Sequence, residues 1–273
     1  MSNFPTSESV QIREVWDENL ASEIRLIRTI VDKYPYIAMD TEFPGTVVVP
    51  TGTSNNIFDY ETMKLNVDML KMIQLGLTFS DAQGNLPTCG TDKHCVWQFN
   101  FNEFDPQQDA HQEQSIKLLS ESGIDFKKNK EKGVSFRDFG ELLMSSGVVS
   151  NHKVHWVVFH SGYDIGYSLK LLTGTNLPRT KQGFFDLVRA FFPNIYDVKH
   201  MITRANGVHG SLKNVAEQLQ IERIGPAHQA GSDSLVTCRV FMRLKARFFG
   251  DRETEKLAGV LFWLGAVDQS NEP

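Results

Sequence analysis

Apolar residues between positions 15 and 34 recur at intervals of three and four. Trp16, Leu20, Ile24, Ile27 and Val31 follow this spacing, which places side chains on one face of a helix. The charged residues between them would then face solvent. The pattern predicts an amphipathic helix that packs one side against a core.

The next segment is a short apolar run that ends in two acids. Ile37, Ala38 and Met39 indicate a buried strand, and Asp40 and Glu42 stand where the run ends. Strand side chains alternate between two faces, so these two carboxylates point to the same side. Like charges at the margin of a core are unfavourable unless a cation or hydrogen bonds compensate them. A bound divalent metal would do so; the plainer alternative is that the strand has ended and both acids are solvated.

Patterns of both kinds continue along the chain. Further strands are predicted at 72–81, 94–101, 154–160 and 195–201, and further helices at 60–71, 109–123, 135–147, 164–174, 183–192, 211–221 and 232–249. The early strands are joined by short connections, which favours antiparallel pairing, whereas the later strands alternate with helices. We therefore predict an α/β fold with a mixed central β-sheet and helices on both faces.

No internal repeat or linker divides the chain. We predict one domain over residues 10–266, with loose termini at 1–9 and 267–273; the polar stretch of residues 1–11 is expected to form no regular element. The basic stretch KKNKEK, residues 127–132, is expected to be a solvated loop rather than a binding element.

Composition limits the classes of function. The net charge of −5 and the pI of about 5.9 argue against a protein that holds nucleic acid on a broad basic surface, so any such role must be local. No apolar run approaches the ~18 residues that cross a membrane, and the N-terminus lacks the basic and apolar regions of a secretory signal. Three cysteines without a CxxC pair favour a reducing, intracellular setting and argue against a thiolate metal site.

Three further residues have the chemistry to complete a site. Asp164 follows a predicted buried strand, at the strand end where open α/β sheets bind ligands, although a plain helix N-cap is the commoner role. His228 lies five residues before Asp233. With Gly231 and the expected helix cap Ser232 between them, the imidazole on the loop and the carboxylate in the first helical turn can converge.

Together these residues make a set of four carboxylates and one imidazole. Carboxylate oxygens suit Mg²⁺ or Mn²⁺ rather than Zn²⁺, and two such ions about 3.5–4 Å apart can clamp the attacking and leaving oxygens of a phosphodiester. A histidine with an ordinary pKa of about 6.5 can take the proton of the attacking water at neutral pH. We assign this role of general base to His228.

The order of these residues resembles that of the DEDD superfamily of 3′–5′ exonucleases, which have a ribonuclease-H-like fold. A histidine five residues before the last aspartate is typical of the h subgroup; the y subgroup has a tyrosine where this chain has Gln229. The flanking motifs are more specific, and they resemble those of the Caf/Pop-type deadenylases, the catalytic subunit of the Ccr–Not complex. The matching motifs include MDTEFPG, NVDMLKMIQLGLTF, FHSGYDIGY, ERIGPAHQAGSDSL and LFWLG, and the likeness runs from about residue 10 to 266.

The resemblance implies a poly(A)-specific 3′–5′ exoribonuclease that shortens mRNA tails, releases 5′-AMP and acts in mRNA turnover and translational control. It implies that Asp40, Glu42, Asp164 and Asp233 hold two divalent cations, Mg²⁺ or Mn²⁺, and that His228 activates water. The implied partners are poly(A) RNA, the NOT scaffold subunit and the leucine-rich-repeat nuclease subunit of the Ccr–Not complex, without a membrane. The implied location is the cytoplasm, including mRNA-decay foci, and also the nucleus.

Two points stay open in the sequence. Phe43, directly after Glu42, has the chemistry to stack on a nucleotide base, but a position at the edge of the core explains it equally well. The catalytic residues also fit a DNA exonuclease of the proofreading kind. A mainly bridging adaptor is a further alternative, although the intact set of acids argues against it.

Overall fold

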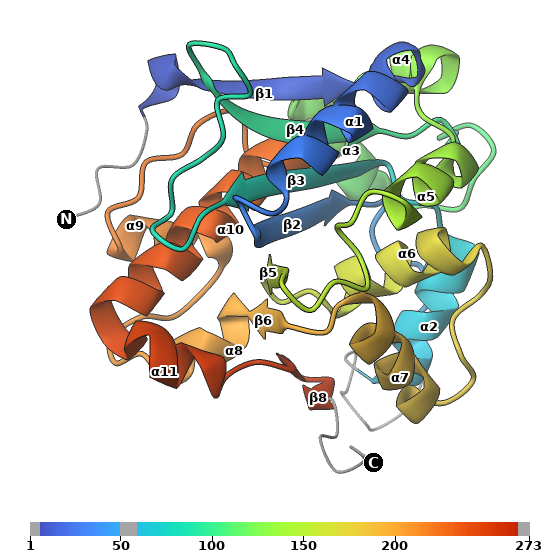
Figure 1. The fold of residues 1–273 in the computed structure, drawn as a ribbon. Coiled ribbons are helices and arrows are strands. Elements are labelled where there is room, and N and C mark those ends of the chain that lie inside the picture. The colour runs from blue at the N-terminus through green and yellow to red at the C-terminus, as the bar shows by residue number, and fades with distance from the viewer. Residues whose placement is uncertain (1–5, 50–58, 267–273) are drawn as a thin grey trace.

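A six-stranded sheet forms the centre of the molecule and lies between two layers of helices (Figure 1). The computed structural model describes residues 6–49 and 59–266. The strands are β1 (Val10–Val15), β2 (Tyr36–Glu42), β3 (Gln74–Ser80), β4 (His94–Asn100), β5 (His155–Val158) and β6 (Ile195–Asp197), with a separate small hairpin of β7 (Val260–Leu261) and β8 (Gly265–Ala266).

Pairing in the sheet is mixed, as the sequence predicts. The strand order is β1-β4-β3-β2-β5-β6. β3 is antiparallel to both β2 and β4, whereas β1 and β4, β2 and β5, and β5 and β6 are parallel pairs. Because β2 and β5 run in the same direction, their carboxyl ends meet at one edge of the sheet, where α/β proteins place ligand sites.

Helices cover both faces of the sheet, which confirms the predicted arrangement. They are α1 (Leu20–Ile30), α2 (Tyr60–Met69), α3 (Glu113–Glu121), α4 (Phe126–Lys132), α5 (Phe136–Met144), α6 (Gly162–Thr173), α7 (Lys181–Phe191), α8 (Val198–Ile202), α9 (Leu212–Gln218), α10 (Ala230–Leu244) and α11 (Gly250–Glu255). Short 3₁₀ turns at Ser7–Ser9 and Asp17–Asn19 precede β1 and α1, and a π-helical turn at Lys245–Phe249 extends α10.

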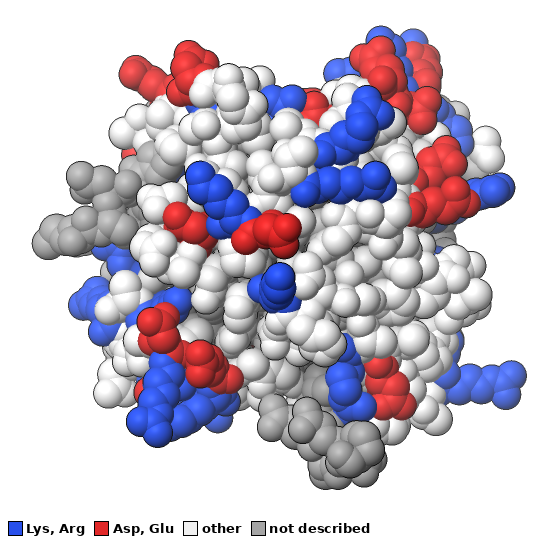
Figure 2. Space-filling view, in the orientation of Figure 1, with Lys and Arg blue, Asp and Glu red and all other residues white. Residues whose placement is uncertain are grey.

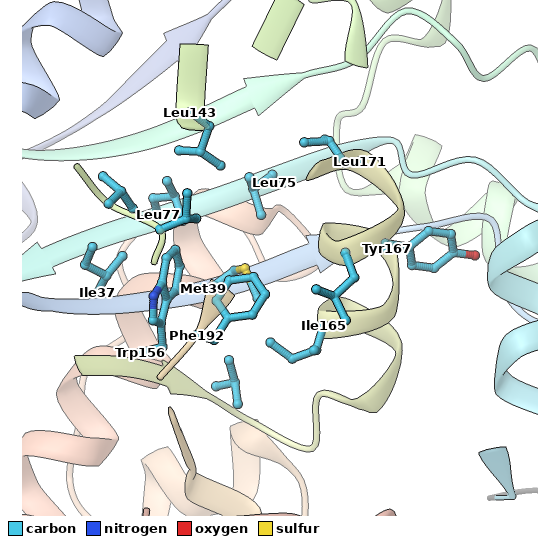
Figure 3. Close-up of a cluster of buried hydrophobic side chains, with 14 of the residues drawn as sticks. Ile37, Met39, Leu75, Leu77, Leu143, Trp156, Ile165, Tyr167, Leu171 and Phe192 are labelled. Carbon is cyan, nitrogen blue, oxygen red and sulfur yellow. The ribbon is translucent and has the colours of Figure 1, made fainter. Parts of the chain in front are cut away.

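The larger core fills the side of the sheet that carries α1, α5 and α6 (Figure 3). Ile37 and Met39 of β2 point into it, together with Trp156 of β5 and Ile165 of α6. The intervening Ala38 belongs to the second core, where α8, α9 and α10 pack. This alternation along β2 fixes the side toward which the acids that follow must point.

The prediction that residues 1–11 form no regular element is wrong, because β1 at the sheet edge already begins at Val10. The polar side chains of β1 have tertiary partners. Arg13 donates to both carboxylate oxygens of Glu23 in α1, at 2.7 and 2.8 Å, and Glu14 accepts from Gln98 of β4 at 2.9 Å. Val10 and Ile12 alternate with a polar residue, but Arg13 and Glu14 interrupt the alternation, so no continuous apolar pattern marks the strand.

Residues 127–132 belong to α4, so the predicted loop is wrong, although the charged side chains of this stretch are exposed as predicted. Asp125 caps the helix by accepting from the Lys128 N–H at 2.9 Å. The Lys128 ammonium lies 4.0 Å from the centroid of the Trp16 ring. The capping acid and the aromatic partner therefore stabilise a helix where the composition alone predicts a loop.

On the face in Figure 2, Lys and Arg lie among Asp and Glu rather than in one basic patch. The mixed charge agrees with the acidic composition. It fits the expectation that any contact to nucleic acid is confined to a local site. Within the described ranges, no helix combines the length and the apolar character that a membrane crossing requires.

Helix α10 lies directly against the sheet, across β2 and β3. A side chain at Gly76 of β3 would overlap the Ala230 carbonyl in the first turn of α10. On the helix side, a Cβ at Gly231 would lie 2.9 Å from Ile12 and 3.1 Å from Gln98. Glycine at both positions lets the backbones approach closely, and this contact sets where α10 begins relative to the carboxyl end of β2.

Replacing Gly76 by Ala should destabilise the fold. The added methyl group has to displace the backbone at the start of α10, so the free energy of unfolding should fall by about 3 kcal/mol or more. Urea unfolding followed by circular dichroism measures the change.

Gly183→Ala in α7 is the matched control for this substitution. The nearest neighbours of a Cβ at Gly183 are side-chain atoms at 3.0 Å or beyond, so the free energy of unfolding should change by less than about 1 kcal/mol. Equal effects of the two substitutions would contradict the close approach of α10 to β3.

Candidate active site

Asp40 and Glu42 lie at the carboxyl end of β2, on the side that faces α10. Ile37 and Met39 are buried in the larger core, while Ala38 is buried in the second core with residues of α10. Strand alternation therefore carries both acids to the α10 side. Both residues are partly buried rather than free in solvent, and the charge of Glu42 raises the pKa of Asp40.

Asp164 reaches the same edge from the neighbouring strand, in the first turn of α6 after β5. Its Oδ1 accepts from the Thr41 backbone N–H at 2.9 Å and from the Thr41 hydroxyl at 2.6 Å. Thr41 stands between Asp40 and Glu42, so these bonds fasten the start of α6 to the acidic end of β2. The alternative of a plain helix N-cap is wrong, because Ser161 occupies the cap position and Asp164 bonds across to β2.

His228 and Asp233 converge across the loop-to-helix junction, as predicted. Asp233 lies in the first turn of α10 and His228 on the loop before it, and the His228 N–H donates to Asp233 Oδ2 at 2.9 Å. A ring nitrogen of His228 and carboxylate oxygens of Asp233 and Glu42 lie within 4.8 Å of one another. The cap expected of Ser232 is wrong, since its hydroxyl donates to the Ile224 carbonyl at 2.8 Å.

The four carboxylates form one interacting group. Burial raises the pKa of Asp40 and of Glu42 well above the usual range, and the neighbouring charges of Asp233 and Asp164 raise both further. Burial also raises the pKa of Asp164, although the hydrogen bonds from Thr41 oppose this shift. The fold therefore holds the ionised carboxylates together at a cost in free energy that a bound cation can offset.

A cation that the sequence pattern did not reveal lies beside this group. The Arg223 guanidinium forms an ion pair with Asp233 and donates to the Ser232 hydroxyl at 3.1 Å. Its charge lowers the pKa of Asp40 and of Glu42, against the larger effect of burial. The sequence shows this arginine in the motif ERIGPAH. An irregular loop separates it from Asp233, so no periodic pattern predicts the ion pair.

The donor set fits hard divalent cations. All four carboxylates offer oxygen, the ligand atom that Mg²⁺ and Mn²⁺ prefer. Glu42 and Asp233 present oxygens within 4.8 Å of each other and of a His228 nitrogen, which makes these residues a candidate group for holding an ion. Burial, together with the repulsion between neighbouring carboxylates, raises the pKa values of Asp40 and Glu42, and such an ion would offset both effects.

Phe43 lies beside these acids and is held by two tyrosines of α6. Its ring is stacked on Tyr163, with the centroids 5.5 Å apart, and is tilted against Tyr167 at 5.1 Å. The side chain is partly buried and packs against the larger core. The protein thus occupies part of the ring surface, and base stacking stays a prediction for the remainder.

Comparison with known proteins gives the family. The profile of the CAF1 family ribonucleases matches residues 15–141 and 136–241. The chain belongs to the CAF1 family. The probable CCR4-associated factor 1 homolog 7 of Arabidopsis thaliana is 58% identical over 268 residues, which cover 97% of each chain. Poly(A) ribonuclease pop2 of Schizosaccharomyces pombe is 43% identical over 264 residues, which cover 96% of this chain and 77% of that one.

Solved structures share the fold of this CAF1-family chain. S. pombe Pop2p with bound Mg²⁺ and Mn²⁺ has a TM-score of 0.85 at 43% identity, covering 92% of this chain and 99% of that one. A chain in the structure of the yeast NOT1 MIF4G domain co-crystallised with CAF1 has a TM-score of 0.78 at 32% identity, covering 95% of this chain and 99% of that one. An exonuclease I structure, with a TM-score of 0.53 at 14% identity over 78% of this chain and 41% of that one, shows a shared fold alone. The predicted ribonuclease-H-like fold is thereby confirmed.

Asp40→Asn should stabilise the metal-free CAF1-family protein at neutral pH. The pKa of the Asp40 carboxyl is raised in the folded state. Its contribution to stability is therefore full below the unfolded pKa of about 3.9 and is lost as the pH rises through the folded pKa. Asparagine does not ionise and avoids this loss. Thermal unfolding in EDTA should show a gain of a few degrees at about pH 7 that shrinks toward about pH 4.

Asp92→Asn in the exposed loop before β4 is the matched control and should leave the melting temperature unchanged. Addition of Mn²⁺ should raise the melting temperature of the wild type more than that of Asp40→Asn. A variant less stable than the wild type at neutral pH in EDTA would contradict the repulsion inferred at this site.

Proposed function

We propose that the protein is a metal-dependent 3′–5′ exoribonuclease that shortens mRNA poly(A) tails and releases 5′-AMP. The observation that carries the proposal is the convergence of Asp40, Glu42, Asp164 and Asp233, with His228 beside them. Membership of the CAF1 family of ribonucleases supports the class of reaction. The relative pop2, a poly(A) ribonuclease, supports the substrate.

The four carboxylates would hold two divalent cations, Mg²⁺ or Mn²⁺. Both ions occur in the Pop2p structure, and the oxygen donors of the site favour them. When bound, such ions polarise the phosphodiester and neutralise charge on the attacking and leaving oxygens. Thr41 steadies Asp164 for this role through two hydrogen bonds, and Arg223 steadies Asp233 through its ion pair.

His228 is proposed to act as the general base. Its imidazole nitrogen would take the proton from the attacking water, since histidine is suited to this transfer at neutral pH. The residue is exposed, so water has access to the ring. The nearby carboxylates of Glu42 and Asp233 would stabilise the imidazolium that forms.

The protein is further proposed to work as a subunit of the Ccr–Not complex. Likeness to yeast CAF1, co-crystallised with the NOT1 MIF4G domain, supports docking on the NOT scaffold subunit. The name of the Arabidopsis relative, CCR4-associated factor, supports contact with the leucine-rich-repeat nuclease subunit. Co-purification from cells tests the assembly, and a tagged chain that recovers neither subunit would contradict it.

The proposed locations are the cytoplasm, including mRNA-decay foci, and the nucleus. Fluorescence imaging of the tagged chain in cells tests these locations.

The purified chain should shorten an RNA with a 3′ A-tail in Mg²⁺ or Mn²⁺, and EDTA should stop the reaction. Asp40→Asn should lower the rate by about a thousandfold, because metal ions that supply several kcal/mol of transition-state stabilisation lose a ligand. Denaturing gels follow the tail, and chromatography identifies 5′-AMP as the product.

Two controls separate this activity from its alternatives. Asp92→Asn should retain the full rate, and a DNA of the same sequence should be a poor substrate, since the 2′-OH distinguishes the two. Shortening without a divalent cation, or equal shortening by Asp40→Asn, would contradict the proposal. Rescue of tail shortening in cells by Asp40→Asn would favour the adaptor alternative instead.

Phe43 is proposed to stack on the terminal adenine. Phe43→Leu should then raise the KM for A-tailed RNA about tenfold, as expected for one lost base–aromatic contact, with little change in kcat. If the ring only completes the edge of the core beside Tyr163 and Tyr167, the substitution would lower the melting temperature and leave the KM unchanged. Steady-state kinetics and thermal unfolding on one preparation decide between the two.

A further inference from the structure

The backbone of His228 has an unusual conformation that the surrounding structure must hold. Its φ angle is +61°, in the left-handed region that residues other than glycine seldom adopt. Such a conformation is unfavourable and persists only where neighbouring contacts fix it. The bond from the His228 N–H to Asp233 Oδ2 is one such contact. Further contacts come from Gln229, the residue that follows.

Gln229 supplies these contacts through both ends of its side chain. Its Nε2 donates to the Ser122 carbonyl at 2.9 Å, directly after α3. Its Oε1 accepts from Gln98 Nε2 of β4, also at 2.9 Å. The side chain of Gln229 therefore bridges the end of α3 and strand β4. Its amide can rotate only if both hydrogen bonds break.

Ser122 contacts His228 itself. The Ser122 hydroxyl lies 2.9 Å from the His228 carbonyl and 2.7 Å from the Leu119 carbonyl, so it shares one proton between two acceptors. Gly123, with φ of +102°, then turns the chain away, and a Cβ at Gly123 would lie 3.1 Å from Gln229 Nε2. The end of α3 is thus shaped to receive the loop that carries His228.

The sheet side of this arrangement is equally well anchored. Gln98 is buried, its Nε2 also donates to Glu14 of β1 at 2.9 Å, and its Oε1 accepts from the Gly231 N–H at 2.9 Å. At the other end of α3, the Gln112 N–H donates to the Pro44 carbonyl at 2.9 Å. Helix α3 therefore contacts both the chain that leaves the acidic end of β2 and the loop that carries His228.

We propose that Gln229, assisted by Ser122, is a positioning residue that holds the His228 imidazole toward Glu42 and Asp233. This inference rests on the proposed function, in which His228 takes the proton from water. Gln229 touches neither the metal ligands nor the substrate in this role. It acts through the backbone of His228, and a displacement of a general base by about 1 Å can cost about a hundredfold in rate.

Gln229→Leu removes both hydrogen bonds at similar side-chain size. We expect kcat on A-tailed RNA to fall between about tenfold and a hundredfold, while the KM and the affinity for Mn²⁺ stay unchanged. Ser122→Ala, which leaves Gln229 in place, should give a smaller loss in the same direction. Gln114→Leu is the matched control, because Gln114 is exposed on the same helix, and it should retain the wild-type kcat.

A double-mutant cycle with His228→Ala separates positioning from general destabilisation. If Gln229 acts through His228, Gln229→Leu should cause no further loss of kcat in the His228→Ala background. The same fold-loss in both backgrounds would overturn the inference. If His228→Ala alone leaves the rate unchanged, the proposed role of His228 as general base fails. This result differs from the one that overturns the positioning role, in which His228→Ala lowers the rate and Gln229→Leu lowers it equally in both backgrounds.

Hydrogen exchange tests the same positioning without any activity. Peptides that cover residues 224–234 should exchange faster in Gln229→Leu than in Gln114→Leu, because the loop loses its attachment to α3 and β4. Equal exchange in the two variants would overturn the inference even if the wild type degrades RNA. Faster exchange confined to Gln229→Leu would support the inference even if the wild type proves inactive on poly(A).

Discussion

Four carboxylates share one end of the sheet, and the arrangement around them offsets their mutual repulsion. Asp40 and Glu42 arrive on β2, Asp164 on α6 and Asp233 on α10. Since no single element carries them all, the fold has to hold three elements together where like charges push them apart. The two bonds from Thr41 to Asp164, the ion pair of Arg223 and the close contact of α10 with Gly76 provide this restraint.

The same restraint explains why buried acids are compatible with a stable protein. Burial and neighbouring charge raise the pKa values of Asp40 and Glu42, and burial raises that of Asp164. The ionised site therefore lowers the stability of the metal-free protein, and a bound cation would offset this cost. The cores on either side of the sheet are large and apolar, and they supply the stability that the site gives up. Stability and function are therefore divided between the centre of the sheet and its edge.

Much of the fold and of the site follows from patterns that act over short distances. Apolar spacing predicts most helices and strands, because each element buries one face. Alternation predicts that Asp40 and Glu42 share a side, and the loop-to-helix junction predicts that His228 approaches Asp233. The likeness to the CAF1 family adds the order in which these residues occur along the chain.

What the sequence does not predict depends on tertiary contacts that follow no periodic pattern. β1 pairs with β4, and its Arg13 and Glu14 bond to Glu23 and Gln98. Arg223 reaches Asp233 through an irregular loop. A glutamine or asparagine within an apolar strand indicates a tertiary hydrogen bond, because a buried polar group needs a partner. The amide alone does not identify that partner.

Equilibrium dialysis against Mn²⁺ tests the inferred metal site most directly, because it counts bound ions without relying on activity. We expect two ions per wild-type chain at saturation, with clearly weaker binding in Asp40→Asn and Asp233→Asn. Absence of binding to the wild type, or binding that is unchanged in both variants, would mean that these carboxylates are brought together for a reason other than holding metal.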